Sequence, residues 1–451
     1  MKKLVNLMAA LALLAMIPGL SRAQTSTDRS ELDTFMKATE AQGAVPPVGT
    51  KITMANWTQY KAFMPFGMTK LFEGGYQWKM PADVEIDIGP VTNGNLPKTF
   101  LEATEKYGAQ NSVAVLPDGH YQLNNFHGGI PFPNPEEPHK GWKMLANVFL
   151  AYTPAVITST PDNMGTIWFI DRFGNVSQVN IDLVYRWSSY ITDPGMPAEE
   201  NYVPGSWFTE WLMEEQPEQA RYTASLAIFY KDQEAHPYPD QFVFVPALRR
   251  SLRLSTTARC APIFGSDWAN DDAKLNGFNG STSTYDATWL SDRKEVELLD
   301  TDMSKGSNYP ENYDLPLGFP KPSWGAWQVR PTSVIDVFRI PAEASGYCYS
   351  HRVMYLDRET WSTYWNDNFD SNSKLWKVFA YENSYGQIPN LGKAWVGIAA
   401  MSWDLQNTHM TVWSSWGNKN ARSHYINRAA PAEYLNGTRY GAPAGMMQIL
   451  R

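Results

Sequence analysis

The chain has 451 residues and a net charge of −8, with 46 acidic and 38 basic side chains. An acidic protein does not follow phosphate backbones, and the sequence has no basic cluster with interleaved aromatic residues, so we expect no nucleic-acid partner. The 18 Trp, 23 Tyr and 20 Phe residues are mostly expected in the core of a large β architecture.

Residues 1–23 have the pattern of a cleaved secretory signal peptide. Two lysines precede an apolar run over 4–20, which ends in Ser21-Arg22-Ala23, with small residues at the two positions that signal peptidase inspects. A membrane anchor is the alternative, but the run is short for a span and ends in this cleavage pattern. We therefore expect cleavage after Ala23, export from the cytoplasm, and a flexible leader over 24–45.

Two stretches near the N-terminus have helical periodicity. Within residues 52–72 aromatic and methionine residues recur at helical spacing, and Pro65 is expected to interrupt the helix. Residues 97–107 form a second predicted helix, because Pro97 suits a first turn and the apolar side chains fall on one stripe.

From residue 113 onward the pattern predicts mostly strands. One hairpin is expected around the turn Pro117-Asp118-Gly119, and another joins 168–171 to 179–187 through Gly174-Asn175. Apolar and polar residues alternate in the last of these strands, so it has one buried and one wet face. The short connections favour an antiparallel sheet. Further strands are expected at 222–230, 241–255, 334–340, 349–357, 375–381 and 408–413, and a long loop at 300–330.

The sequence has two cysteines, Cys260 and Cys348. In an exported protein two cysteines suggest one disulfide, with two buried free thiols as the alternative. The spacing gives no distance, so both remain open.

No compact catalytic constellation is present, and we expect neither catalytic residues nor a cofactor. The seven histidines do not form a His-Glu-x-x-His motif, and the chain has no Gly-x-Ser-x-Gly elbow and no phosphate loop. The densest acidic cluster, residues 265–272, lacks the spacing and closing Glu of an EF-hand loop. It is expected to be a polar turn rather than a metal site.

Residues 241–255 are the most informative stretch. Even positions carry Phe242, Phe244, Leu252 and Leu254, with Arg250 in the same apolar row. An inward arginine needs a partner, because an unpaired buried charge is costly, and Asp267 follows shortly after. We therefore expect an ion pair between Arg250 and Asp267. The alternative is that Pro246 seats a bulge, the register slips by one residue, and the arginine points to water.

Several motifs in this region resemble a known family. They are Phe244-Val245-Pro246-Ala247-Leu248-Arg249-Arg250, then Gly265-Ser266-Asp267 and Asp271-Asp272. Further matches are 103–107, 128–133, 355–361, 367–370 and 375–378. Their shared order resembles an uncharacterised family of Gram-negative periplasmic proteins related to the LolA/LolB outer-membrane lipoprotein-sorting proteins.

The resemblance implies a mainly β (α+β) fold: a large curved antiparallel sheet forming an open half-barrel, with a few helices on its concave side. It covers residues 46–451 as one domain with an N-terminal helical extension. It also implies a periplasmic location, a cavity for a lipid-like ligand, and partnership with a resistance-nodulation-division-type transporter and an outer-membrane barrel. The residues expected to line the cavity are Phe242, Phe244, Leu252, Leu254, Tyr355 and Trp376.

Three functions remain open from the sequence. The leading hypothesis is a non-enzymatic carrier of a hydrophobic molecule, because apolar concave walls offer acyl chains a dry site. The abundant Trp and acidic residues also suggest a secreted protein that binds or degrades carbohydrate. The third is an envelope scaffold without a ligand.

Overall fold

The computed structural model describes residues 29–74, 79–161, 164–200, 202–255, 259–274, 276–299, 311–314, 318–325, 327–388, 390–414 and 425–450. The proposed signal peptide lies outside these residues, as do 300–310, 315–317 and 326 of the expected loop at 300–330.

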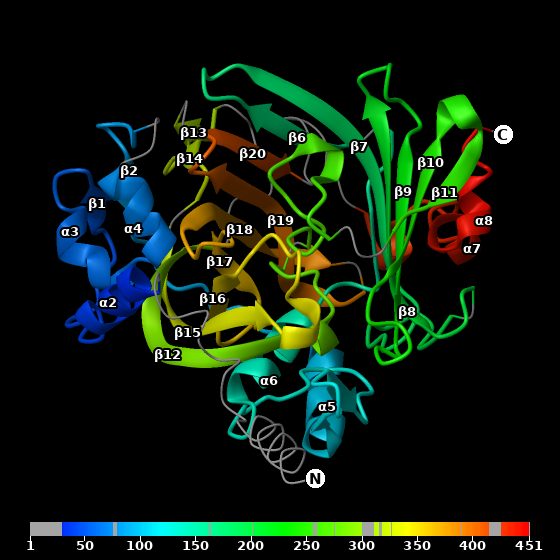
Figure 1. Ribbon diagram of the computed structural model, residues 1–451, viewed down its shortest axis with the longest axis horizontal. Helices are drawn as coiled ribbons and strands as arrows, with labels where there is room; N and C mark the ends of the chain where they lie inside the picture. The colour runs from blue at the N-terminus through cyan, green and yellow to red at the C-terminus, as the bar shows by residue number, and fades with distance from the viewer. Residues whose placement is uncertain are drawn as a thin grey trace, which may run out of the picture.

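The main element is an antiparallel sheet that curves around a central space (Figure 1). Its described strands follow the order β11-β10-β9-β8-β7-β6-β20-β19-β18-β17-β16-β15-β12, so the path runs from edge to edge without closing. The predicted fold class, a mainly β protein with an open, curved antiparallel sheet, is confirmed. The strands of this sheet are β5 (Val156–Thr158), β6 (Gly165–Ile170), β7 (Val176–Trp187), β8 (Ser206–Gln216), β9 (Ala224–Tyr230), β10 (Asp240–Val245), β11 (Arg250–Arg253), β12 (Tyr285–Leu298), β15 (Trp327–Arg339), β16 (His351–Asp357), β17 (Thr363–Phe369), β18 (Leu375–Ile388), β19 (Gly392–Asp404), β20 (His409–Ser414) and β21 (Tyr425–Ile426).

Three two-stranded antiparallel sheets lie outside the main sheet. They pair β1 (Lys51–Thr53) with β2 (Glu85–Asp87), β3 (Ser112–Val115) with β4 (Tyr121–Asn124), and β13 (Tyr313–Asp314) with β14 (Phe319–Pro320). The β3–β4 pair is the hairpin predicted around Pro117-Asp118-Gly119.

The two predicted helices form where the local signals placed them. Pro65 precedes α4 and separates it from α3, and Pro97 precedes α5. Helix α6 was not predicted, and almost all of its residues are buried. The described helices are α2 (Ser30–Ala38), α3 (Trp57–Tyr60), α4 (Phe66–Glu73), α5 (Lys98–Tyr107), α6 (Lys140–Phe149), α7 (Gly437–Gly441) and α8 (Pro443–Met446).

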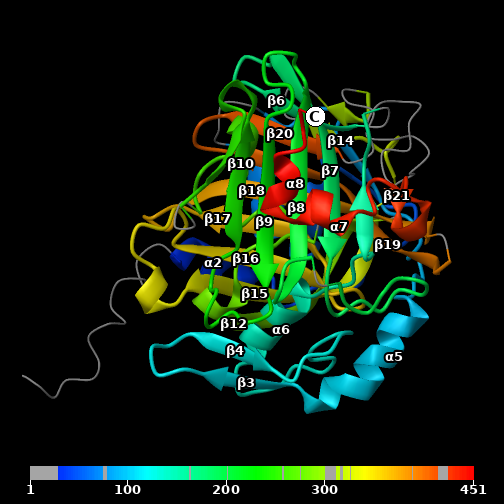
Figure 2. The same cartoon turned by 90° about the vertical axis from the view of Figure 1, so that its right-hand side faces the viewer.

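Both faces of the curved sheet are covered. One buried cluster joins inward residues of opposite wings, such as Leu212 on β8 and Phe379 on β18, to helix α6, so it marks the concave interior. A second cluster packs α2 and α4 against the outer face of β15–β20. A third packs α7 and α8 against the outer face of β7–β10 (Figure 2). Among the helices, α6 therefore occupies the expected concave position, and α2, α4, α7 and α8 lie outside.

The N-terminal leader is ordered where the structure describes it. Residues 30–38 form α2, whose Leu32 and Phe35 are buried. The Phe35 ring meets Phe66 of α4 edge-on, with centroids 5.4 Å apart. Two apolar side chains therefore fix this short helix to the outer face of the sheet. None of the helices in the described part of the chain is long and apolar enough to cross a membrane.

Residues 241–255 form a hairpin rather than one bulged strand. Strand β10 ends at Val245, a helical turn covers Pro246–Leu248, and Arg249 adopts a left-handed conformation before β11 returns. Val243 lies opposite Leu252 in the ladder. The single even-numbered row therefore does not exist, since the turn changes the relation between the two halves.

Candidate functional site

The space inside the half-barrel is partly filled by residues 259–274 and 276–284, here called the inner segment. Its Asp271 is fully buried and accepts hydrogen bonds from Arg259 Nε at 2.6 Å, Arg339 of β15 at 2.8 Å and Tyr347 Oη at 2.8 Å. Burial alone would raise the pKa of Asp271, but the guanidinium groups of Arg259, Arg339 and Arg352 lower it below its ordinary range. Asp271 is therefore a carboxylate held by cations.

The neighbouring Asp272 makes a second set of buried contacts. Its carboxylate accepts from Arg352 Nη1 at 2.9 Å, Tyr349 Oη at 2.8 Å and the backbone N–H of Ala269 at 3.0 Å. The acidic cluster is thus more than the polar turn that we expected, because its aspartates fasten the inner segment to β15 and β16.

A disulfide joins the same two regions. Cys260, in the inner segment, is bonded to Cys348, just before β16, with their Cα atoms 5.7 Å apart. At its other side the segment is tied to the end of α6, where Lys274 Nζ donates to Phe149 O at 2.8 Å and Asn276 Nδ2 donates to Val148 O at 2.7 Å.

A cavity of about 250 Å³ remains between the inner segment and strands β8–β10. Leu254, Ala261 and Pro262 at one end are exposed, and Leu212 and Trp413 at the other are buried. The cavity therefore runs from a mouth at the surface to a base inside the half-barrel. Its lining residues are Tyr185, Glu210, Leu212, Glu214, Thr223, Ser225, Leu226, Ala227, Gln241, Phe242, Val243, Leu254, Ala261, Pro262, Ile263, Phe264, Asn270, Ala273, Asn279 and Trp413.

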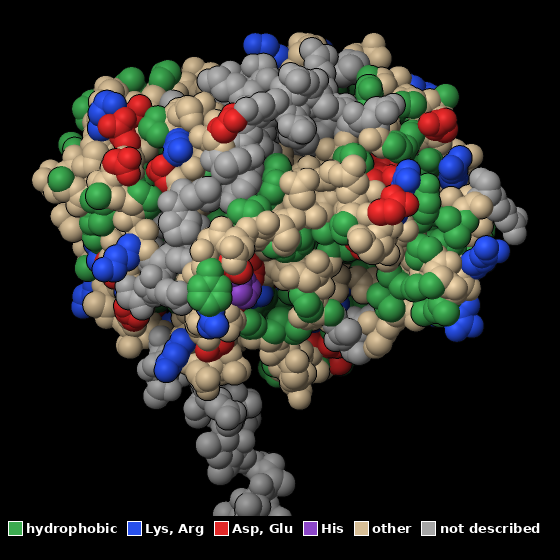
Figure 3. Space-filling model, turned by 90° about the horizontal axis from the view of Figure 1, so that it is seen from above, with side chains coloured by type: hydrophobic (Ala, Val, Ile, Leu, Met, Phe, Trp, Pro, Cys, Tyr) green, Lys and Arg blue, Asp and Glu red, His purple; other side chains and the backbone are tan. Residues whose placement is uncertain are grey.

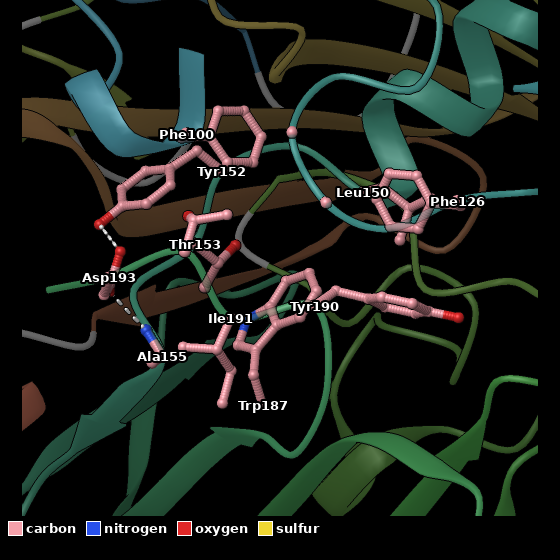
Figure 4. Close-up of a pocket in the computed structure, with 13 residues that line it drawn as sticks. Phe100, Phe126, Leu150, Tyr152, Thr153, Ala155, Trp187, Tyr190, Ile191 and Asp193 are labelled. Atoms are coloured by element: carbon pink, nitrogen blue, oxygen red, sulfur yellow. Dashed lines mark hydrogen bonds between the residues drawn. The ribbon is translucent and has the colours of Figure 1, made fainter. Parts of the chain in front are cut away.

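Two other hollows are less suited to a ligand. The one in Figure 4 has room for only about 10 Å³, roughly one water molecule, because Phe100, Tyr152 and Trp187 fill it. There Asp193 accepts hydrogen bonds from Tyr152 Oη and Ala155 N. The groove between α2 and β12 is larger, about 630 Å³, but charged residues such as Asp33 and Arg293 line much of it. We regard the cavity beside β8–β10 as the candidate site, because it combines an apolar wall with depth.

The structure brings two of the six predicted ligand-binding residues to this cavity. Phe242 and Leu254 line it, although Phe242 also packs against the outer cluster. Leu252 is half-buried on β11, opposite Val243, and does not contribute to the lining. Phe244 was placed on the wrong face: it is buried in the outer cluster with α7 and α8.

Tyr355 and Trp376 also lie away from the cavity. Tyr355 is in the other outer cluster, the one with α2 and α4, where its Oη accepts a hydrogen bond from Phe66 N at 2.9 Å. Trp376 is half-buried and donates from Nε1 to Asp404 at 2.9 Å. Both are explained by packing and hydrogen bonding to the protein itself.

The predicted ion pair between Arg250 and Asp267 is wrong. Arg250 is exposed at the start of β11, because the turn after Pro246 points it to water. Asp267 is buried and instead pairs with His409, and its Oδ2 accepts from Thr411 at 2.9 Å. The alternative that sent the arginine to solvent was correct in outcome, although through a hairpin turn rather than a bulge.

Asp267, Asp404 and His409 offer ligand atoms within 4.8 Å of one another. The protein already provides partners here: Asp404 Oδ1 accepts from the backbone N–H groups of Gln406 at 3.1 Å and Asn407 at 2.8 Å. The contact with Asp267 raises the pKa of His409, as expected for a cation beside a carboxylate. We interpret the cluster as a hydrogen-bonded ion pair.

The sequence analysis missed the residues at the base of the cavity. Glu210, Leu212 and Glu214 come from β8, which was not predicted, and Asn279 and Trp413 come from distant parts of the chain. A signal existed on β8 in its strand-forming aromatic residues Trp207, Phe208 and Trp211, although apolar and polar residues do not alternate along it. Nothing local indicates that Asn279 and Trp413 meet that strand.

Charged side chains of both signs are dispersed over the face of the molecule that Figure 3 shows. Hydrophobic side chains lie between them over the described part of this face. The many tryptophans are mostly internal: Trp142, Trp268, Trp324, Trp327, Trp365 and Trp403 are all among the most buried side chains.

Comparison with solved structures gives distant likenesses. A domain from Vibrio parahaemolyticus, described as an outer membrane lipoprotein-sorting protein domain, is 15% identical with a TM-score of 0.44, covering 66% of this chain and 96% of its own. A DUF1329 family protein from Desulfovibrio piger ATCC 29098 is 15% identical with a TM-score of 0.43, and the match covers 68% of this chain and 100% of that protein. A LolA superfamily protein from Nitrosomonas europaea is 13% identical with a TM-score of 0.33, covering 61% and 90%.

No curated protein matches the sequence significantly. A family model, by contrast, matches residues 51–437, which is most of the chain and includes the inner segment and every strand that lines the cavity. The family expected from the sequence motifs is confirmed, and the chain belongs to the family described as "Protein of unknown function (DUF1329)".

Proposed function

We propose that this protein is a periplasmic carrier that binds a hydrophobic small molecule in the cavity beside β8–β10. The observation that supports this most directly is the cavity itself, about 250 Å³ on the concave face, with an apolar wall that includes Leu212, Val243, Ile263 and Phe264. Each methylene group that a ligand buries there contributes about 0.8 kcal/mol, so a partly enclosed chain is enough for micromolar binding.

The architecture favours binding in an internal cavity over recognition of carbohydrate on the protein surface. Trp289 is the one tryptophan among the exposed large hydrophobic residues of the described chain. Sugar-binding surfaces present aromatic rings to solvent, whereas these rings build the clusters that hold the sheet in shape.

The periplasmic location and the partners rest on the sequence. The pattern of residues 1–23 favours export, and the family resemblance suggests work beside a resistance-nodulation-division-type transporter and an outer-membrane barrel. Sequencing the N-terminus of the protein from a periplasmic extract tests the first point, and we expect it to begin at Gln24.

The binding proposal is tested with purified protein freed of lipid and the fluorescent probe N-phenyl-1-naphthylamine. We expect saturable binding that Leu254→Asp weakens about fivefold or more, because a charge at the mouth removes part of the roughly 1.5–3 kcal/mol that a buried leucine contributes. Leu248→Asp is the matched control: Leu248 is 51% exposed and Leu254 43%, but only Leu254 lines the cavity. If the wild-type protein binds no hydrophobic probe, the carrier proposal fails and the envelope scaffold replaces it.

A further inference from the structure

The base of the cavity carries three polar atoms that need a partner. Glu210, Asn279 and Trp413 line the cavity and are 8%, 4% and 3% exposed. Within the described part of the chain, Glu210 Oε1, Asn279 Oδ1 and Trp413 Nε1 have no hydrogen-bond partner. Buried polar groups in folded proteins are normally paired. Three unpaired ones that line a single cavity are available to hydrogen-bond a molecule bound there.

The remaining hydrogen bonds of this region fix the positions of these atoms. Asn279 Nδ2 donates to Glu210 Oε2 at 3.1 Å, so the amide orientation leaves Oδ1 as an acceptor. Trp413 belongs to β20 and lies in the interior cluster, with its ring centroid 5.7 Å from that of Trp268. The base therefore offers two acceptors and one donor from three separate elements.

The charges around the base select against an ionised head group. Glu210 feels the buried ammonium of Lys274 and, more weakly, the guanidinium of Arg259; burial nevertheless raises the pKa of Glu210 to about 7. A cationic head group beside Glu210 would be repelled by the ammonium of Lys274, which is buried nearby and acts on Glu210, although Lys274 itself does not line the cavity. A carboxylate would meet Glu210 and the half-buried Glu214. A neutral head group avoids both repulsions and the cost of burying another charge.

We propose that the cavity binds a hydrophobic molecule that ends in a hydroxyl group, such as a long-chain or polycyclic alcohol. This inference rests on the proposed carrier function and assigns its ligand class. A hydroxyl group is both donor and acceptor. It donates to Glu210 Oε1 or Asn279 Oδ1 and accepts from Trp413 Nε1, while the apolar body lies along Leu212 and Phe264 toward the mouth.

The test is displacement of bound N-phenyl-1-naphthylamine from lipid-free protein by four compounds of one chain length. These are the primary alcohol, its methyl ether, the fatty acid and the alkylamine. We expect the alcohol to displace the probe at about fivefold to tenfold lower concentration than the ether, which lacks the donor, as one buried hydrogen bond implies. The acid and the amine are expected to be weaker than the alcohol as well.

Two variants test which side chains bind the hydroxyl group of the alcohol. Trp413→Phe keeps an aromatic ring but removes Nε1, the donor to the ligand oxygen, so it should raise the concentration of alcohol needed to displace the probe while the probe still binds. Trp403→Phe is the control, because Trp403 is also buried but belongs to the outer cluster with α2 and α4, away from the cavity. Glu210→Gln, which keeps an oxygen acceptor, should retain the preference for the alcohol over its ether, and melting curves show that each variant is folded.

The outcomes separate the two proposals. If the probe binds but the alcohol and the ether displace it equally, the hydroxyl assignment is refuted and the carrier function stands. The assignment also fails if Trp413→Phe raises the concentration of alcohol needed to displace the probe no more than Trp403→Phe does. If the wild-type protein binds no probe, both proposals fall.

Discussion

Removing the carboxylate of Asp271 should destabilise the protein far more than removing an exposed charge. The Asp271→Ala variant leaves Arg259 and Arg339 buried without their shared partner. Breaking a buried ion pair from one side typically costs about 3–5 kcal/mol, because the remaining charge is uncompensated. Arg253→Ala, which breaks an exposed pair with Asp240, should cost about 1 kcal/mol or less.

The assay is equilibrium unfolding in urea under oxidising conditions, which preserve the disulfide. The midpoint of the Asp271→Ala variant should fall well below that of Arg253→Ala, with the denaturant slope unchanged, so that the shift reports stability alone. Equal midpoints for the two variants would refute the reasoning, because the network would then contribute no more than a surface pair. A change in the denaturant slope would instead show that the substitution had altered the compactness of the native or denatured ensemble.

Three further predictions follow from other buried contacts. Phe244→Ala should cost about 3–5 kcal/mol in unfolding experiments and leave probe binding unchanged, because this ring packs under α7 and α8. Burial raises the pKa of Glu382, which accepts from Trp324 Nε1, well above its ordinary value. The folded protein keeps Glu382 protonated, whereas the unfolded chain releases this proton above about pH 4.5. The free energy of unfolding therefore falls by about 1.4 kcal/mol for each pH unit above that value, until the pKa of the folded state is reached. Unfolding at several pH values should therefore show Glu382→Gln gaining on the wild type as the pH rises from 5 to 8; a constant difference would contradict this. Finally, denatured, unreduced protein should label no thiols, and replacing Cys260 and Cys348 by Ser should lower the unfolding free energy by up to roughly 4 kcal/mol, as closure of such a long loop implies.

Local patterns predicted those parts of the fold that depend on neighbours in the chain. The β6–β7 hairpin formed because alternation and the turn at Gly174-Asn175 act within a few residues. Pro65 separates α3 from α4 because proline cannot donate within a helix. Helix α6 was missed although Lys140, Lys143 and Asn147 recur at helical spacing, and its start has no clear signal because the preceding residue, His139, is not a favoured N-cap.

The face toward which a side chain points could not be predicted in the same way. Phe244 lies on a strand with apolar residues on both faces, and alternation does not say which face is concave. The decision is made by α7 and α8, almost two hundred residues later in the sequence, which cover the outer face of that wing. Arg250 similarly depends on Pro246, which only the alternative interpretation treated as a bulge and which the fold uses as a turn. Sequence patterns gave the strands, and tertiary packing assigned their faces.

The buried network also explains why the cavity lies beside one wing of the sheet. Beneath β15 and β16 the inner segment meets arginines, and Asp271 and Asp272 hold it there. Toward β8–β10 the same segment presents Ile263 and Phe264. Since the ion pairs and the disulfide hold the segment in place, the inner wall exists before a ligand arrives, and binding need not bear the cost of ordering it. If the proposed carrier function holds, we expect a ligand to enter between β10 and residues 261–264 at the mouth, rather than by displacing the inner segment from the half-barrel.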